Sequence, residues 1–433
     1  MNWDSRETHL SLPHIRKPAE QPFSETVPAT YSTHDLPGGP RLAHSHLPES
    51  ECAAVSIYIP VGSRDEIGNI PAGLAHFSEH MAFKGTKTRS AKELTLAIES
   101  GGGQANAATS EDHTVYEAQG EAELMPVLIE VLADMVWHST FPSNEIELER
   151  DVIGEEITMI RESPSDHIND LLASALWPSH PLGQSISGSL ESIEKISRSS
   201  LKHFAKEHHF RKDLVIATAG PMSAEEILAS LLPQMPKKFK KPALQQAYSP
   251  SPSREIIENR PTDQLQLGLA WHTPGRHSGQ RHALRMLSLI LGESSSSRLF
   301  TELREERGLC YQVGSETTLF HETGALQILA GLDPDSRDES METIFRETQD
   351  LADNGPRPGE LERAKRLAIA QSKLAFESTA AHAAWAGEGL LFYNRIPSPQ
   401  EARENFLNVT GEQVQAIAKT IFAQQPATAE IRS

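Results

Sequence analysis

The chain of 433 residues is poor in cysteine and has no long apolar run. Its two cysteines, Cys52 and Cys310, lie far apart in sequence, which argues against a disulfide framework and favours a reducing compartment. No stretch of about 18 consecutive apolar residues occurs, so no transmembrane helix is expected. The N-terminus, MNWDSRETHLSLPHIRKP, is polar and lacks the apolar segment of a signal peptide. Together these absences predict a cytoplasmic protein.

Basic residues are outnumbered by acidic ones. The sequence contains 40 lysines and arginines and 59 aspartates and glutamates, which gives a formal net charge of −19 at pH 7. Nucleic acids and anionic membranes repel such a chain, so neither is expected as a partner. A preference for basic ligands is compatible with this charge, although most surface charge is simply solvated and aids solubility.

The length of the chain exceeds what one compact core usually contains, so two or more domains are expected. The segment 233–255 is rich in Pro, Lys and Ser and has little apolar periodicity, which predicts a linker. It would separate residues 25–232 from residues 256–433. Residues 1–24 would form an N-terminal extension.

Parallels between the two parts of the chain indicate a duplication. Each part has a strand-like stretch that ends in a turn signal, at residues 51–63 and 264–275. The sequence ELER begins at Glu147 and again at Glu360, in both cases after a turn with proline and at the start of a helix-like stretch. Two homologous α/β halves are therefore expected. At the same offset Glu156 corresponds to Ile369, so the second half has the scaffold without this acidic residue.

The stretch GLAHFSEHMAFKG, residues 73–85, carries two histidines and a glutamate at helical spacing. His76 and His80 are four residues apart and share one face of a helix, and Glu79 lies on the same side. Zinc binds neutral imidazole nitrogens, and a carboxylate beside a zinc-bound water can take its proton. H-x-x-E-H is the inverted form of the zinc peptidase motif. On this stretch alone, histidines that merely satisfy nearby polar groups remain an alternative.

A second predicted helix, residues 144–162, offers further carboxylates. Its apolar stripe consists of four isoleucines at helical spacing, Ile146, Ile153, Ile157 and Ile160. Glu149 and Glu156 border this stripe, whereas Glu155 lies on the opposite side. A carboxylate at a buried edge needs a partner or a metal, so one of the two bordering glutamates can be a ligand and the other can support the site. Surface salt bridges, for instance with Arg150 or Arg161, are the alternative.

Several motifs together resemble the pitrilysin, insulin-degrading enzyme and mitochondrial processing peptidase family of inverzincin zinc peptidases, in its shorter two-domain bacterial type. They are HFSEH, GEEI with its second glutamate 76 residues later, GSRDE (62–66), GGGQANAATSEDHTVYEA (101–118) and LREERGLCYQVGS (303–315). The resemblance runs from about residue 25 to the C-terminus. It implies an α+β fold with two homologous α/β-sandwich domains, each a mostly antiparallel sheet with helices packed on one face.

The resemblance also assigns roles within the site. It implies that His76, His80 and Glu156 bind one zinc ion per chain, that Glu79 is the catalytic base, and that Glu149 is the supporting glutamate. The second domain would have no zinc site. The agreement on Glu156 is independent of the helical-wheel argument, which had left Glu149 and Glu156 as equal candidates.

The segment that opens with three glycines, residues 101–118, predicts a strand after a tight turn. A strand beside a zinc site can bind an extended peptide along its edge. In similar peptidases this segment is that edge strand, which makes Gly103, Asn106 and Ala107 the expected substrate-binding residues. An ordinary core strand after a glycine turn is the alternative.

Arg304 and Tyr311 are seven residues apart, so they share one side if the stretch is largely helical. An Arg fork and a Tyr hydroxyl can orient a carbonyl and stabilise an oxyanion. By composition alone these are surface residues, but the resemblance implies a catalytic pair that approaches the substrate from the facing half. Longer relatives form a closing chamber from four such domains. This chain supplies two, so a second chain is expected, as a homodimer or a heterodimer, with the pair serving the partner's zinc site.

The sequence thus predicts a zinc-dependent endopeptidase that hydrolyses peptides or small unfolded proteins inside a clamshell chamber. Water on the zinc, activated by Glu79, would attack the scissile carbonyl, and the zinc with Arg304 and Tyr311 would stabilise the oxyanion. The alternatives are a non-catalytic scaffold subunit, or a peptide-binding subunit, of a heteromeric peptidase complex. The intact set of site residues counts against a scaffold.

Overall fold

The structure is a computed structural model that describes residues 29–242 and 252–433. The predicted N-terminal extension, residues 1–24, lies outside the described residues. Of the predicted linker, residues 243–251 also lie outside them, and the strand β7 already begins at Glu255.

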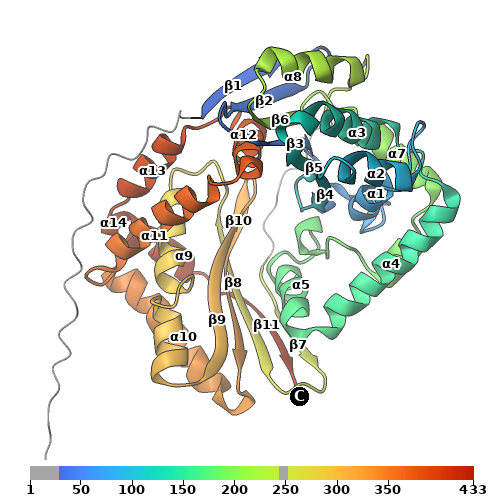
Figure 1. Ribbon diagram of the computed structural model, residues 1–433. Helices are drawn as coiled ribbons and strands as arrows, with labels where there is room; N and C mark the ends of the chain where they lie inside the picture. The colour runs from blue at the N-terminus through green and yellow to red at the C-terminus, as the bar shows by residue number, and fades with distance from the viewer. Residues whose placement is uncertain (1–28, 243–251) are drawn as a thin grey trace, which may run out of the picture.

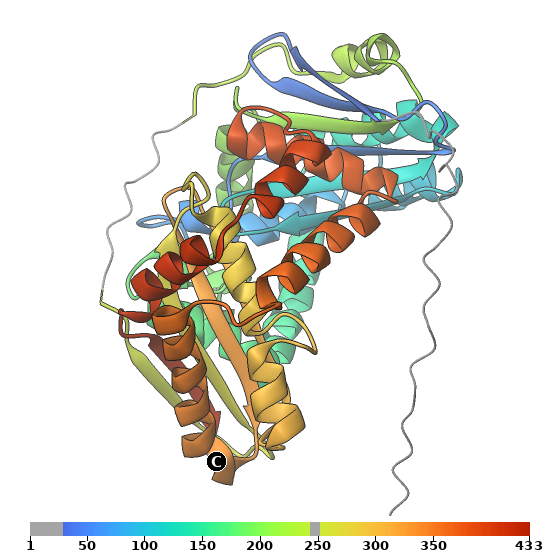
Figure 2. The same ribbon diagram turned by 90° about the vertical axis from the view of Figure 1, so that its left-hand side faces the viewer.

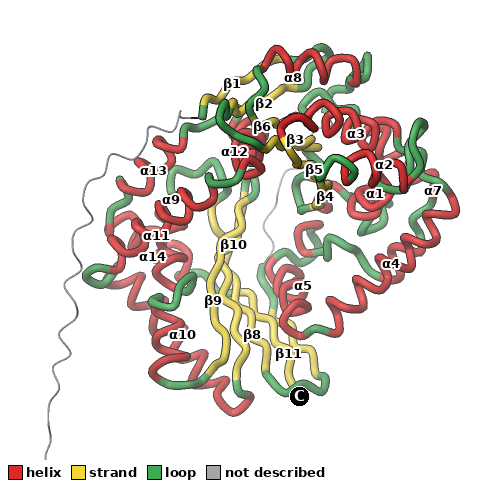
Figure 3. Tube along the Cα trace, in the orientation of Figure 1, coloured by secondary structure: helices red, strands yellow, loops and turns green. Residues whose placement is uncertain are grey.

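Two sheets form the framework of the described chain (Figure 3). The first has the order β1-β2-β6-β3-β5-β4 and the second β7-β11-β8-β10-β9. The strands of the first are β1 (Thr30–Asp35), β2 (Arg41–His46), β3 (Cys52–Ile59), β4 (Gln104–Thr109), β5 (Thr114–Glu121) and β6 (Val215–Gly220). Those of the second are β7 (Glu255–Asn259), β8 (Leu265–Pro274), β9 (Cys310–Leu319), β10 (Thr323–Leu332) and β11 (Ala427–Arg432).

The strand pairings of the two sheets are equivalent. Without β1, the order β2-β6-β3-β5-β4 corresponds strand for strand to β7-β11-β8-β10-β9. The parallel pair is β2 with β6 in one sheet and β7 with β11 in the other, and the pairs that follow are antiparallel. The duplication and the mostly antiparallel sheets predicted from the sequence are therefore confirmed. In this correspondence β4 and β9 are the equivalent edge strands.

One face of each sheet is covered by helices of its own half, with which it shares a hydrophobic core. On the first sheet these are α1 (Leu74–Ala82), α2 (Ala91–Glu99), α3 (Met125–His138), α4 (Ser143–Glu162), α6 (Leu190–Glu194), α7 (Arg198–His208) and α8 (Ala224–Leu231). On the second they are α9 (Arg281–Leu291), α10 (Arg337–Asn354), α11 (Glu360–Ala375), α13 (Pro399–Leu407) and α14 (Gly411–Phe422). None of the helices in the described residues is long and apolar enough to cross a membrane.

The opposite face of each sheet is covered by a helix from the other half, which the sequence analysis did not anticipate (Figures 1 and 2). Helix α12 (Thr379–Tyr393) packs Ala386 and Leu390 against the first sheet. Helix α5 (Pro164–Leu176) packs Ile168 and Leu172 against the second. The reason is visible in the central strands: β3 is buried along both faces after its first residue, so a single helical layer would leave one apolar face in water.

Candidate metal centre

Helix α1 carries the two histidines, and its first turn is held in place by contacts specific to this sequence. Gly73 precedes the helix with φ +90°, and a Cβ there would lie 2.5 Å from the carbonyl oxygen of Ser187. Both the positive φ and this close approach therefore require glycine at position 73. The buried carboxylate of Glu66 accepts hydrogen bonds from the backbone N–H of Gly73 (2.8 Å) and of Ala75 (2.6 Å). These bonds satisfy N–H groups that a helix start leaves free, and they fix the position of α1.

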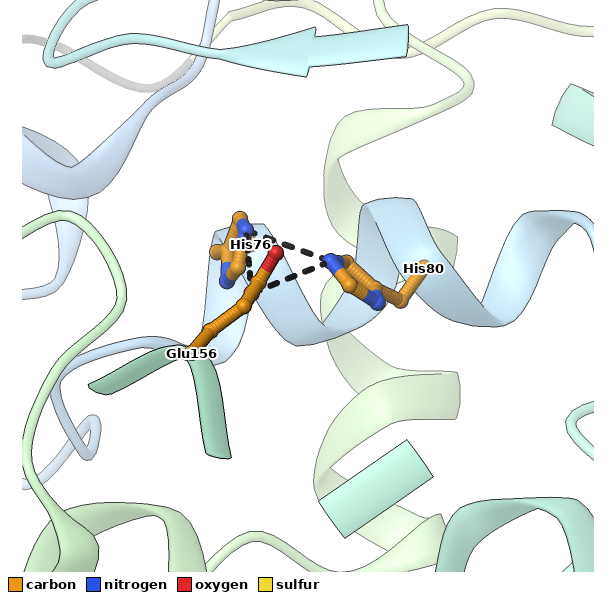
Figure 4. A group of neighbouring side chains, drawn as sticks. All are labelled: His76, His80 and Glu156. Atoms are coloured by element: carbon orange, nitrogen blue, oxygen red, sulfur yellow. Dashed lines mark hydrogen bonds and ion pairs between the residues drawn. The ribbon is translucent and has the colours of Figure 1, made fainter. Parts of the chain in front are cut away.

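Three side-chain atoms from α1 and α4 converge on one point (Figure 4). Nε2 of His76 lies 3.3 Å from Nε2 of His80, and Oε2 of Glu156 lies 3.8 Å and 3.7 Å from these two atoms. The point in their plane that is equidistant from all three lies about 2.1 Å from each, which matches zinc–nitrogen distances of about 2.0–2.1 Å. In residues 29–242 and 252–433 this is the only group of three such side chains that could hold a metal ion.

The polar atoms of this group are short of hydrogen-bond partners. Oε2 of Glu156 and Nδ1 of His76 are buried and have no hydrogen-bond partner among the described residues. A buried polar atom without a partner is costly, and a metal ion would compensate the carboxylate oxygen. Burial, and then the neighbouring His80, lower the pKa of His76 to about 4, so its ring is neutral at pH 7, as metal ligation requires. Two imidazoles and one carboxylate therefore fit a divalent transition metal such as zinc.

Glu149 lies about two helical turns before Glu156 on α4. Its carboxylate contacts Nδ1 of His80, the ring nitrogen that is not part of the three-atom group. Nδ1 of His80 donates a hydrogen bond to Oε2 of Glu149 at 3.0 Å, and the other carboxylate oxygen is paired with Lys84. A proton on Nδ1 leaves the lone pair of Nε2 directed at the three-atom group. Glu149 is buried and Glu155 is exposed, as the helical wheel of the sequence analysis indicated.

Glu79 is not part of the three-atom group, although it lies between the two histidines in sequence. Its carboxylate points to the edge strand β4, where the hydroxyl of Thr109 donates a hydrogen bond to Oε2 at 2.9 Å. Burial raises the pKa of Glu79, and the hydrogen bond from Thr109 opposes this shift. A carboxylate with a raised pKa, beside a candidate metal site but outside the group of candidate ligands, is suited to accept and return a proton.

The group opens into a cavity of about 770 Å³. Asn106 and Ala107 of β4 line it, whereas Gly103 does not: a Cβ at that glycine would instead meet Leu124 and Ile98. The structure therefore brings two of the three predicted substrate-binding residues to the cavity. Because β4 is the last strand of its sheet, its outer edge is open to another strand.

The cavity also contains residues that the sequence analysis missed, among them Thr109, Asp170 and Ser187. Asp170 comes from α5, the helix that crosses to the second sheet, and burial raises its pKa. The position of Thr109 on the predicted edge strand, two residues after Ala107, was the signal that could have identified it. No sequence signal was available for Asp170 and Ser187, because only the fold brings them to the site.

Arg304 and Tyr311 do not line this cavity. Arg304 belongs to a short π-helical segment, Phe300–Glu306, and Tyr311 belongs to β9, so the stretch is not largely helical, which was the condition for the predicted shared side. The two side chains are nevertheless adjacent, with the guanidinium 5.2 Å from the centre of the tyrosine ring. Tyr311 is 73% exposed, which leaves its hydroxyl accessible from outside the chain.

Comparisons with known proteins identify the family of the chain. Residues 41–189 match the model of the family described as insulinase (peptidase family M16), and residues 195–368 match that of the peptidase M16 inactive domain. The chain is 32% identical to an uncharacterized zinc protease of Mycobacterium tuberculosis, over 90% of each protein. It is 31% identical to the uncharacterized zinc protease YmxG of Bacillus subtilis, over 91% of this chain and 96% of the relative.

Two solved structures share the fold. A protease from Helicobacter pylori superposes with a TM-score of 0.85 at 21% identity, over 94% of this chain and all of that one. A protein from Pseudomonas fluorescens described as a peptidase M16 inactive domain superposes with a TM-score of 0.84 at 22% identity, over 93% and 98% of the two chains. At these identities the likeness concerns the α+β architecture alone.

Proposed function

The chain belongs to peptidase family M16, the insulinase family, and on this premise we propose that it is a zinc-dependent endopeptidase. The observation that carries the proposal is the convergence of His76, His80 and Glu156 on one point, with Glu79 beside it. These three side chains would hold one zinc ion per chain. When bound, the ion would act as a Lewis acid, which would lower the pKa of a coordinated water and polarise a carbonyl group.

Glu79 is the general base of this mechanism. Its carboxylate is held by Thr109 and faces the cavity without joining the ligand group. Glu79 accepts a proton from the attacking water and then passes it to the nitrogen of the leaving amine. Glu79 is buried in a cavity that a bound substrate would close. Closure would exclude bulk water and so strengthen the electrostatic interactions of Glu79 with the reacting groups.

The edge strand β4 is the substrate-binding element. An extended peptide can add to its open edge through backbone hydrogen bonds, with Asn106 and Ala107 beside the scissile bond. Such binding requires an unpaired strand from the substrate, which short peptides and unfolded chains can supply and folded proteins cannot. The substrates are therefore peptides or small unfolded proteins, enclosed in a clamshell chamber.

A second chain completes the site. Arg304 and Tyr311 are adjacent and accessible but lie outside the cavity of their own chain. In a pair of chains, as a homodimer or as a heterodimer with a homologous chain, they would face the partner's zinc site and donate hydrogen bonds to the developing oxyanion.

The direct test compares the wild type with Glu79→Gln in hydrolysis of a quenched fluorescent peptide, with zinc content measured on the same samples. We expect the wild type to contain zinc and to lose activity with a chelator, and Glu79→Gln to retain zinc while kcat falls about 100- to 10,000-fold. Glu155→Gln, on the exposed side of α4, is the matched control with wild-type activity. Wild-type rates in Glu79→Gln would contradict the mechanism, and a zinc-loaded wild type that cleaves no peptide would favour the scaffold or peptide-binding alternative.

A further inference from the structure

We propose that the second half of the chain positions the general base through a buried ion pair between the halves, with Arg276 holding the β4–β5 turn and Thr109 orienting Glu79. This inference rests on the proposed function, because it gives a task to Glu79 as base. It assigns the half without metal ligands a role in the site of its own chain, and it makes Thr109 and Arg276 positioning residues.

Two contacts within the second half hold the Arg276 side chain, and a third contact joins it to the first half. Its guanidinium donates to the carbonyl oxygen of Leu319 at 2.6 Å and stacks on Phe392 with 3.7 Å to the ring centre. The same Nη2 donates to Oδ2 of Asp112 at 2.5 Å. Both side chains of this ion pair are about nine-tenths buried. An arginine held by two other contacts presents its charge at one place, so Asp112 is held there as well.

Asp112 belongs to the turn that connects β4 to β5, and this turn is stiff. The backbone N–H of Ser110 donates to the carbonyl oxygen of His113, and the Ser110 hydroxyl accepts from the His113 N–H. The turn is also hydrogen-bonded to the 3-10 helical turn Ser63–Asp65: Ser63 N–H donates to Ser110 O, and Arg64 N–H donates to Glu111 O. A turn with these contacts moves as one unit, so fixing Asp112 fixes the residues on either side of it.

Thr109 is the last residue of β4 and directly precedes this turn. Its hydroxyl donates a hydrogen bond to Oε2 of Glu79 at 2.9 Å. Among the described residues, no other side chain donates to this carboxylate. A general base must present one oxygen to the attacking water within hydrogen-bond reach. By binding Oε2, the Thr109 hydroxyl fixes the orientation of the carboxylate, and a hydrogen bond from the Thr109 backbone to the same carboxylate supports it.

A second contact between the halves acts on the start of the same helix. Arg64 pairs with Glu322 of the β9–β10 turn, and two residues later Glu66 anchors the backbone of Gly73 and Ala75 at the start of α1. The two contacts are reciprocal: in each, an arginine that follows the central strand of one half, β3 or β8, binds a carboxylate in the equivalent hairpin turn of the other half. Glu79 is therefore held at its backbone through α1 and at its carboxylate through Thr109.

The test uses the full-length, zinc-loaded chain and four variants. Thr109→Val keeps the shape and removes the hydroxyl, and Thr109→Ser restores a hydroxyl. Arg276→Met breaks the ion pair between the halves. Arg337→Met is the matched control, because it breaks an ion pair with the buried Glu430 inside the second half, away from the β4–β5 turn. We measure kcat and KM on a quenched peptide, zinc content, and hydrogen exchange of residues 109–114.

We expect Thr109→Val to lower kcat roughly 10- to 100-fold with KM within about twofold and zinc content unchanged, and Thr109→Ser to recover most of kcat. Arg276→Met should lower kcat and speed hydrogen exchange of residues 109–114 about tenfold or more, whereas Arg337→Met does neither. If Arg276→Met does not fold, Asp112→Asn takes its place.

Two results overturn the inference alone: a kcat of Thr109→Val equal to that of the wild type while Glu79→Gln is inactive, or equal exchange of the turn in Arg276→Met and Arg337→Met. A wild type without any peptidase activity overturns the proposed function instead. The hydrogen exchange of the turn distinguishes the two cases, because it does not depend on catalysis.

Discussion

Glu149 accepts a hydrogen bond from the far ring nitrogen of His80 at 3.0 Å, and this contact connects the middle of α4 to the end of α1 behind the ligand group. The carboxylate is buried and also pairs with Lys84. It therefore determines which ring nitrogen of His80 carries the proton and in which direction the other one points. Supporting contacts of this kind decide how well a ligand is oriented before the metal arrives.

Glu149→Gln should weaken zinc binding about 10- to 100-fold, because a neutral amide is a poorer acceptor for the His80 N–H and leaves Lys84 without its counter-charge. The measurement is a competition titration against a chromophoric chelator. Glu147→Gln is the matched control on the exposed side of the same helix. Equal zinc affinities of the two variants would contradict this role of Glu149.

Gly73→Ala should both destabilise the chain and weaken zinc binding. The residue has φ +90°, and the new methyl group would lie 2.5 Å from the carbonyl oxygen of Ser187, so α1 has to shift. Gly68→Ala is the control, because Gly68 has φ +72° with nothing within 4 Å of a Cβ and so tests backbone strain alone. We expect about 1 kcal/mol of destabilisation for Gly68→Ala and more for Gly73→Ala. Zinc affinity should fall only in Gly73→Ala, and unchanged affinity there would show that α1 tolerates the shift.

The ion pair between Asp112 and Arg276 should make stability depend on pH in the acid range. Burial alone would raise the pKa of Asp112, but the hydrogen bond from His113 and the positive charge of Arg276 together outweigh it, so the pKa lies below the ordinary value of 3.8. Because the pKa is lower in the folded chain, the ionised carboxylate stabilises the fold above about pH 4, and this contribution disappears as the pH falls through the folded-state pKa.

Asp112→Asn tests this dependence through urea midpoints at several pH values. The variant should be less stable than the wild type by about 3 kcal/mol at pH 7, since it leaves a buried arginine without its counter-charge. The difference should shrink below pH 4. Asp151→Asn, on the exposed side of α4, should show no such trend. A difference that stays constant from pH 7 to pH 3 would contradict the ionic origin of the effect.

Sequence periodicity located the candidate ligands because they lie on two regular helices. The spacing of four residues places His76 and His80 on one face of α1, and the isoleucine stripe of α4 turns Glu149 and Glu156 toward it. The duplication was visible in the repeat at Glu360, and the matching strand orders confirm it.

What the sequence could not supply are relations between distant segments. The exchange of α5 and α12 between the sheets depends on tertiary packing, so the expectation of helices on one face of each sheet was incomplete. Arg304 and Tyr311 would share one side only if the stretch were largely helical, and this condition is not met, because Gly308 has φ +65° and follows the end of the helical segment before β9 begins. The Arg304 guanidinium reaches the Tyr311 ring because the chain turns between them, and helical periodicity does not bring them together.

Mixing two inactive variants should restore activity if Arg304 and Tyr311 serve the site of a second chain. Glu79→Gln lacks the base but keeps Tyr311, and Tyr311→Phe lacks an oxyanion donor but keeps Glu79, with an expected loss of about 100-fold or more in kcat. After subunit exchange, half of the dimers are mixed and each has one complete site of two, so activity should reach about one quarter of the wild-type value. The measurement is peptide hydrolysis before and after exchange, with the solution mass of each sample determined by ultracentrifugation. Activity that stays at the level of the separate variants in a sample of confirmed dimers would show that the tyrosine acts within its own chain or outside the reaction.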